Sequence, residues 1–287
     1  MKTLCLSMIV KNEAKIIEEC FDSVIDYIDY WVICDTGSTD GTQDIIRNYF
    51  SNKKIKGELH QMEWKNFGYN RTLSMEKSYK KADYILLLDA DFRLKVLNKS
   101  FKETIGNGDN YLIRYAGNLN YRNLKLVDGN VKWKYVGVTH EYITSDEKFN
   151  KINNDDIQIV DCAQGSNRAV KFERDSKLLL KGIVDEPTNV RYFFYLANTY
   201  YEHGDNEIAM KYYKKRVEMG GWVEEVYYSM YRYAMAKMKN ESMEAAVYDF
   251  LKAHNYRPSR LEALYEVVKY YRTADPKKGY AYGMLGY

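Results

Sequence analysis

The feature that most constrains the fold is an alternation, over roughly the first 160 residues, between short apolar runs and amphipathic helical patterns. Apolar runs predict strands at Thr3–Val10, Tyr30–Cys34 and Tyr84–Leu88, and a further strand is predicted at Gly57–Gln61. The intervening segments predict helices at Asn12–Tyr27, Thr42–Phe50 and Arg71–Lys81. This β-α-β order requires a mainly parallel sheet with helices on both faces. Further on, Asn110–Tyr121 and Leu124–Lys134 predict antiparallel additions to the sheet.

The chain changes character after about residue 170, where no strand pattern remains. Helices are predicted at Phe172–Val184, Val190–His203, Asn206–Met219, Val223–Met238, Ser242–Asn255 and Arg260–Thr273. Short loops between helices of this length indicate antiparallel neighbours, and small residues recur along them. The pattern resembles tetratricopeptide-type helix pairs, with an irregular bundle as the alternative. We therefore predict an α/β domain over residues 1–165 and an all-α domain over residues 166–287.

Composition excludes several classes of function. Lys and Arg (43) exceed Asp and Glu (40) only slightly, which does not predict a nucleic-acid partner. No apolar stretch is long enough to predict a transmembrane segment. The four Cys show no CxxC spacing, so structural zinc is not expected, and reduced thiols in the cytoplasm are the default expectation.

The first candidate for ligand binding is Asp35, at the carboxyl end of the second predicted strand. Ligands of open α/β sheets bind outside these strand ends, and a carboxylate there can accept hydrogen bonds from a nucleobase or ribose. The glycines Gly37 and Gly41 would let the following turn approach a ligand closely. An ordinary turn with helix capping is the alternative.

The second candidate is the pair Asp89 and Asp91, which follows the apolar strand Tyr84–Leu88. If the chain stays extended, both side chains project to the same side and repel each other unless a cation lies between them. A hard divalent ion on a diphosphate suits such oxygen ligands. A solvated loop with one helix cap is the alternative.

The third candidate is His140 with Glu141, in a stretch rich in aromatic residues and glycine. His140 could ligate a metal, and Glu141 could take a proton from an acceptor hydroxyl. Arg71 could bind a phosphate or pair with the region of Asp35 and Asp89. The alternatives are a packed His, an exposed Glu and a surface Arg. Asn12 either contacts a ligand or only caps a helix.

Taken together and in order, these motifs resemble glycosyltransferase family 2, the inverting family with the GT-A fold. The resemblance covers about residues 1–165. It rests on the segments Leu6–Glu13, Cys34–Thr42, Leu88–Asp91 and Thr139–Glu141. The helices that follow are similar to the tetratricopeptide-like tail of a branch of that family without membrane helices. Two segments carry this second similarity: Asn189–Tyr200 and Gly220–Glu225.

The resemblance implies a nucleotide-diphosphate sugar donor, with UDP favoured, and Mn²⁺ or Mg²⁺. It implies that Asp91 holds the metal, with His140 as a further ligand. It also implies that Glu141 is the catalytic base, although many members carry an acidic pair there. The remaining residues implied to contact the nucleotide are Val10, Asn12, Glu13, Asp35, Arg71, Asp89 and Ala90.

The expected function is a metal-dependent, inverting hexosyl transfer to a hydroxyl of a glycan, a lipid-linked glycan or a protein. The family's processive membrane enzymes carry a Gln-x-x-Arg-Trp motif that this chain lacks, so polysaccharide synthesis is not expected. The alternative is a catalytically weak GT-A protein whose helical repeats bind a partner. A nucleotidyltransferase is disfavoured, because Lys11-Asn-Glu13 stands where such enzymes carry a glycine-rich phosphate loop.

Overall fold

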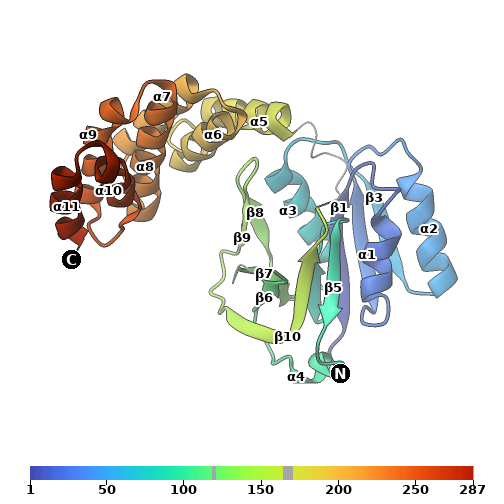
Figure 1. The fold of residues 1–287 in the computed structure, drawn as a ribbon. Helices are drawn as coiled ribbons and strands as arrows, with labels where there is room; N and C mark the ends of the chain where they lie inside the picture. The colour runs from blue at the N-terminus through green and yellow to red at the C-terminus, as the bar shows by residue number, and fades with distance from the viewer. Residues whose placement is uncertain (118–120, 164–170, 287) are drawn as a thin grey trace. The chain divides into compact units, whose positions relative to one another are not determined.

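The computed structural model describes residues 1–117, 121–163 and 171–286. Its internal contacts divide the chain into two compact units, residues 1–169 and 170–287. The predicted boundary between residues 165 and 166 falls outside the described residues. The first unit is built on a sheet and the second is helical, as the sequence predicts (Figure 1).

The sheet of the first unit has eight strands in the order β3-β2-β1-β4-β7-β6-β10-β5. The bounds are β1 Leu4–Val10, β2 Tyr30–Asp35, β3 Gly57–Gln61, β4 Tyr84–Leu87, β5 Phe92–Val96, β6 Tyr111–Tyr115, β7 Arg122–Asp128 and β10 Ile152–Asp161. Strands β1 to β4 pair in parallel, as do β6 and β10. Strand β7 runs antiparallel to β4 and β6, and β5 runs antiparallel to β10. The predicted mainly parallel sheet is therefore confirmed.

Helices cover both faces of this sheet. The first core lies between one face and the helices α1 Ile17–Val24 and α2 Thr42–Lys53, where residues such as Leu6 and Met8 of β1 are buried. The opposite face is covered by α3 Phe67–Ser78, whose Ser74 hydroxyl lies 2.9 Å from that of Ser7. This arrangement explains why β1 and β4 are apolar on both sides.

Helix α3 also carries a small hairpin of β8 Lys134–Val136 and β9 Tyr142–Thr144, which pair antiparallel. The contact with the helix is close: the Phe67 N–H donates to the Val138 carbonyl at 3.1 Å, and the Tyr135 N–H donates to Thr72 Oγ1 at 2.9 Å. The loop of this hairpin is thereby fixed on the amino-terminal half of α3.

Several predicted bounds are wrong for identifiable reasons. Helix α1 begins at Ile17 rather than Asn12, because Asn12 adopts a left-handed backbone (φ 57°) and bonds to a neighbouring loop. Strand β7 ends at Asp128, where the carboxylate of that residue accepts the Asn130 N–H and turns the chain. Of the predicted strand 110–121, residues 118–120 lie outside the described residues and β6 ends at Tyr115.

The second unit consists of consecutive helices that pack on their neighbours. Their bounds are α5 Lys171–Asp185, α6 Val190–His203, α7 Asn206–Glu218, α8 Val223–Asn240, α9 Met243–Tyr256, α10 Glu262–Ala274 and α11 Pro276–Gly283. The recurring alanines of the sequence lie in the helix contacts, where Ala197, Ala209, Ala234, Ala246 and Ala253 are fully buried. A predicted array of antiparallel helix pairs therefore describes this unit well.

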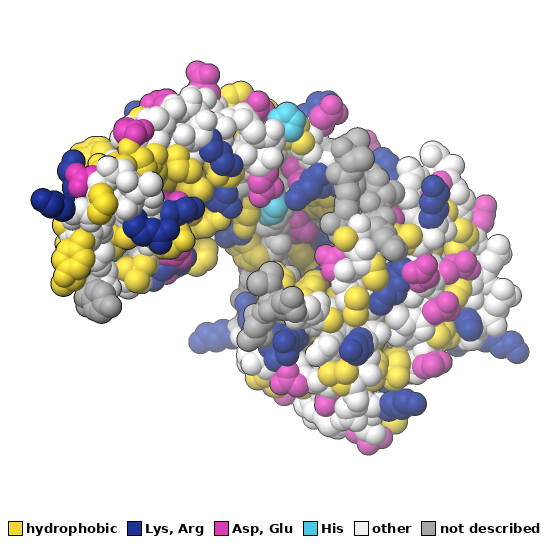
Figure 2. All heavy atoms as spheres, viewed as in Figure 1, with side chains coloured by type: hydrophobic (Ala, Val, Ile, Leu, Met, Phe, Trp, Pro, Cys, Tyr) yellow, Lys and Arg dark blue, Asp and Glu magenta, His cyan; other side chains and the backbone are white. Residues whose placement is uncertain are grey.

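Figure 2 shows hydrophobic side chains gathered on the surface of the helical unit. Tyr248, Tyr265 and Tyr280 of this unit are largely exposed. Within the described residues, no helix combines the length and the apolar character needed to cross a membrane.

Candidate active site

Two loops at the carboxyl ends of β1 and β2 are bonded to each other. The Asn12 N–H donates to Ser38 Oγ at 2.8 Å, and Asn12 Oδ1 accepts the Thr39 N–H at 2.8 Å. The next residue, Glu13, donates its N–H to Thr42 Oγ1 at 2.9 Å. Asn12 therefore holds two loops together and does not cap α1. This keeps the backbone of both predicted nucleotide-binding motifs in one place.

Asp35 ends β2 and is fully buried. Its Oδ1 accepts the N–H groups of Gly37 and Ser38, both at 3.0 Å, and the Gln43 amide at 2.9 Å. Its Oδ2 is buried and has no hydrogen-bond partner among the described residues. Such an oxygen is costly to bury and needs an explanation, and a ligand donor would supply one.

Access to that oxygen requires a movement. Gln61 donates to Gln43 at 2.7 Å and Gln43 donates to Asp35, so a chain of two amides leads to the carboxylate. The carbonyl of Val10 is occupied from the same loop, by the N–H of Thr36 at 2.9 Å and its hydroxyl at 3.1 Å. Because Asp35 is fully buried, a ligand can reach its carboxylate only after neighbouring groups move.

The Asp89-Ala90-Asp91 motif lies in a turn, because β4 ends at Leu87 and the Phe92 N–H donates to the Asp89 carbonyl at 3.0 Å. The extended conformation that would project both carboxylates to one side does not persist. The Asp91 carbonyl accepts the Cys162 N–H at 3.0 Å, which ties the turn to the chain after β10. The turn is thus fixed by backbone bonds on two sides.

Arg71 of α3 joins the second and third candidate motifs. Its Nη2 donates to Asp89 Oδ1 at 2.7 Å, and its Nε donates to Glu141 Oε1 at 2.8 Å. The guanidinium also lies 5.8 Å from the centre of the Tyr135 ring. Of the pairings predicted for Arg71, the one with Asp89 is present, and the second partner is Glu141 rather than Asp35.

The electrostatics of this cluster follow from burial and opposite charges. Burial opposes ionisation of Asp89, but the charges of Arg71 and Lys125 outweigh it and hold the pKa of this carboxyl below its usual value. Burial likewise opposes the charge of Arg71, yet Asp89 and Glu141 raise the pKa of the guanidinium. Asp89 and Arg71 are therefore both charged at neutral pH.

Glu141 reaches Arg71 because of the loop that precedes it. Gly137 (φ 112°) and His140 (φ 50°) both take left-handed conformations. Gly68 of α3 approaches the Gly137 carbonyl so closely that a Cβ there would lie 2.1 Å from the oxygen. Glu141 Oε2 has no hydrogen bond to any described residue, so it remains available as an acceptor. His140 itself is exposed.

Whether a divalent ion could bind at this site depends on the donor atoms that the side chains offer. Among the described residues, no group of three or more His, Cys, Asp or Glu side chains could hold a metal. An all-protein metal site therefore does not fit. Mg²⁺ is commonly bound by one or two carboxylates, substrate phosphates and water, and the half-buried Asp91 fits that mode.

Sequence reasoning missed two members of the cluster, Lys125 and Tyr115. Lys125 is 8% exposed, and the charges of Asp89, Arg71, Glu141 and Asp91 all act on its ammonium. Burial and the Asp89 charge raise the pKa of Tyr115 on β6. The only sequence signal for Lys125 is a lysine inside an apolar strand, which ordinarily predicts an exposed side chain.

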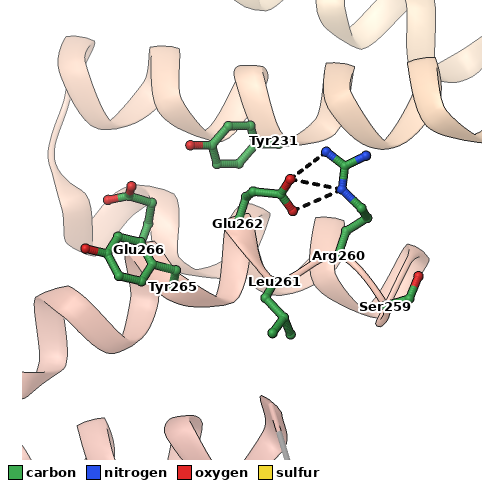
Figure 3. A pocket seen from close by; sticks show the side chains of 7 residues that line it. All are labelled: Tyr231, Ser259, Arg260, Leu261, Glu262, Tyr265 and Glu266. Atoms are coloured by element: carbon green, nitrogen blue, oxygen red, sulfur yellow. Dashed lines mark hydrogen bonds and ion pairs between the residues drawn. The ribbon is translucent and has the colours of Figure 1, made fainter. Parts of the chain in front are cut away.

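A hollow of about 520 Å³ lies in the helical unit (Figure 3). It is lined by Tyr231, Ser259, Arg260, Leu261, Glu262, Tyr265 and Glu266. Arg260 Nε donates to both carboxylate oxygens of Glu262, at 2.9 and 3.1 Å, so these charges compensate each other. The geometry gives this hollow no catalytic group comparable to the cluster around Arg71.

Comparison with known proteins identifies the first unit. The family model for glycosyl transferase family 2 matches residues 5–173. The SPbeta prophage-derived glycosyltransferase SunS of Bacillus subtilis (strain 168) is 28% identical over an alignment of 230 residues that covers 75% of this chain and 53% of the relative. The glycosyltransferase SunS of Bacillus phage SPbeta gives the same values. The chain thus spans about half the length of the curated relatives it matches.

Solved structures match this chain only weakly. The N-terminal domain of stress-induced protein-1 from C. elegans gives a TM-score of 0.34 at 20% identity, covering 36% of this chain and 84% of that one. MamA gives 0.36 at 20% identity, covering 42% and 70%. These scores are too low to carry an argument. The family model, in contrast, matches more than half of the chain, and the protein therefore belongs to glycosyltransferase family 2.

Proposed function

We propose that the protein is a metal-dependent, inverting glycosyltransferase that moves a hexosyl group from a nucleotide-diphosphate sugar to an acceptor hydroxyl. UDP is the favoured nucleotide, and the acceptor is a glycan, a lipid-linked glycan or a protein. Family membership supports glycosyl transfer. The observation that carries the proposal is the Arg71 bridge, since it joins the acidic motif expected at the diphosphate to the expected base.

The donor would bind at the carboxyl ends of β1, β2 and β4. Asp35 would accept a hydrogen bond from the nucleobase through Oδ2, once the Gln43 side chain moves. The backbone of the bonded loops would line the nucleoside, and Asp89 with Ala90 would lie beside the ribose. The residues assigned to this nucleotide site are Val10, Asn12, Glu13, Asp35, Arg71, Asp89 and Ala90.

Asp91 would hold Mn²⁺ or Mg²⁺ together with the substrate's phosphates, and His140 is the further candidate ligand. The ion, when bound, would supply positive charge to the diphosphate. The Cys162 N–H bonds to the Asp91 carbonyl and so holds the backbone of the turn that carries this carboxylate.

Glu141 would remove the proton of the acceptor hydroxyl. Oε1 is held by Arg71 at 2.8 Å, which orients the carboxylate and leaves Oε2 as the proton acceptor. The acceptor oxygen attacks the sugar carbon from the face opposite the diphosphate, the bond to the diphosphate breaks, and the configuration inverts. The positive charge of Arg71 would offset the repulsion between the Asp89 and Glu141 carboxylates during this step.

The alternative is a catalytically weak protein whose helical unit binds a partner. It is favoured by the exposed tyrosines of α9 to α11. It is opposed by the intact Asp35, Asp91 and Glu141, because a decayed site would be expected to lose its carboxylates.

The test is a panel of nucleotide sugars with and without Mn²⁺, scored for release of the nucleoside diphosphate. We expect release from one donor only when metal is present. We expect Glu141→Gln to keep donor affinity and to lose at least a hundredfold in transfer, the usual worth of a general base. Normal transfer by Glu141→Gln would reject the base assignment, and no release from any donor would favour the binding-protein alternative.

A further inference from the structure

Lys125 is a buried cation that forms no ion pair with the part of the chain that the structure describes. It is 8% exposed, and no carboxylate among the described residues lies within 4.0 Å of its ammonium. The ammonium lies 5.0 Å from the centre of the Phe92 ring, the residue that closes the Asp89–Phe92 turn. A buried charge of this kind is costly unless a partner compensates it.

A β-bulge explains how a lysine in an apolar strand comes to lie there. Tyr111 and Leu112 are consecutive in β6, but their partners in β7 are Leu126 and Leu124. Lys125 is therefore the extra residue of a bulge. Bulges re-aim side chains and occur often beside active sites.

The position along the sheet is equally specific. Strand β7 runs antiparallel to β4, and the last registered pair is Leu86 with Leu126. Lys125 is thus the next residue towards the carboxyl end of β4, where the acidic turn begins. Burial lowers the pKa of its ammonium, and the charge of Asp89 resists that effect.

The other cation of the cluster is already engaged. Arg71 is bonded to both Asp89 and Glu141, so its positive charge is compensated by protein carboxylates. Of the two, Lys125 is the one that forms no ion pair with a described residue, and it can therefore meet a negative ligand. The ring of Phe92 gives it only a weak substitute.

We propose that Lys125 binds the diphosphate of the nucleotide sugar and stabilises it as the leaving group, an assignment that rests on the proposed function. When the sugar carbon leaves, the electron pair of its bond stays on the diphosphate oxygen, and the acceptor proton passes to Glu141. The diphosphate gains one negative charge in this step. An ammonium fixed in a water-poor site stabilises that charge without having to reorient.

The test compares ligands that differ in phosphate. Dissociation constants for UDP, GDP and uridine are measured with Mn²⁺ on the wild type, Lys125→Met and Lys125→Arg. For the nucleoside diphosphate that the wild type prefers, we expect Lys125→Met to weaken binding about tenfold to a hundredfold, the worth of one charge-assisted hydrogen bond. We expect uridine binding to change less than twofold. Lys125→Arg keeps the charge and should retain most of the affinity.

Lys95→Met is the matched control, because it removes an exposed lysine from β5 of the same unit. It should bind all three ligands as the wild type does. Unchanged diphosphate affinity in Lys125→Met would overturn the inference, and so would an equal loss for uridine, which indicates a structural role. If the wild type binds no nucleoside diphosphate, the proposed function fails and the inference with it; wild-type binding that Lys125→Met retains overturns the inference alone.

Discussion

Arg71→Met removes the centre of the bridge to Asp89 and Glu141, and it should destabilise the first unit more than the loss of any other arginine near this bridge. The change keeps the aliphatic volume but leaves Asp89 and Glu141 without their shared counter-charge. The side chains of Arg71, Asp89 and Glu141 are 18%, 27% and 13% exposed, so the bridge is partly buried. Removing one partner of a fully buried pair costs about 3–5 kcal/mol and of an exposed pair about 0.2–1 kcal/mol. We expect a loss of ~3 kcal/mol in the free energy of unfolding.

The assay is thermal unfolding of the full chain followed by tryptophan fluorescence. Trp31, Trp64 and Trp133 lie in the first unit and Trp222 in the second, so the signal reports mainly on the unit that contains the bridge. A loss of ~3 kcal/mol corresponds to a fall of roughly 6–12 °C in melting temperature. Arg47→Met is the control, because its pair with Asp44 is exposed and should contribute less than about 0.5 kcal/mol.

The difference in melting temperature between Arg71→Met and the wild type should also depend on pH. In the wild type the pKa of Asp89 is lowered, so its stabilising contribution is fully present above the unfolded value of about 3.9 and is lost only as pH falls below that. Without Arg71, only the charge of Lys125 opposes the effect of burial on the Asp89 carboxyl, so the pKa of Asp89 should rise. Acidification from pH 7 to 5 should therefore narrow the gap between variant and wild type. A gap under 2 °C at pH 7, or one that does not change with pH, would refute the reasoning.

Two further substitutions test the packing, one in each unit. Gly68→Ala puts a Cβ 2.1 Å from the Gly137 carbonyl oxygen, so it should lower the free energy of unfolding by about 1–3 kcal/mol and impair transfer. Gly283→Ala is the control, because its Cβ meets open space and should do neither. Melting curves and the donor assay check both variants. Glu225→Ala leaves the fully buried Arg216 without its partner at 2.7 Å, which should cost the helical unit about 3–5 kcal/mol by circular dichroism and leave nucleotide binding unchanged.

Much of the fold can be predicted because strands that are buried on both faces of the sheet have apolar sequences. The strands β1, β2 and β4 are largely apolar and buried, and the predicted bounds of β3, which is more polar, are those observed. Strand β10 is not predicted, since its first half is polar and only Ile157 and Ile159 of its second half are fully buried. Helix α6 is predicted to the residue, because Asn189 caps its start and Gly204 ends it.

The candidate site is harder to predict, because it depends on contacts between distant segments. The sequence indicates Asp89, Glu141 and Arg71 singly, but the bond from Arg71 to Glu141 spans 70 residues and requires the β8–β9 hairpin to pack on α3. Lys125 could not be predicted, because its direction follows from a register shift between β6 and β7. Such a shift leaves no pattern in one sequence.

The most direct test of the account is a crystal structure of the protein with a non-hydrolysable nucleotide sugar and Mn²⁺. Anomalous scattering would locate the ion independently of the refined coordinates. We expect manganese within bonding distance of an Asp91 oxygen and of the diphosphate, with the nucleobase against Asp35. A nucleotide bound elsewhere, or a manganese peak away from the Asp89–Phe92 turn, would contradict it.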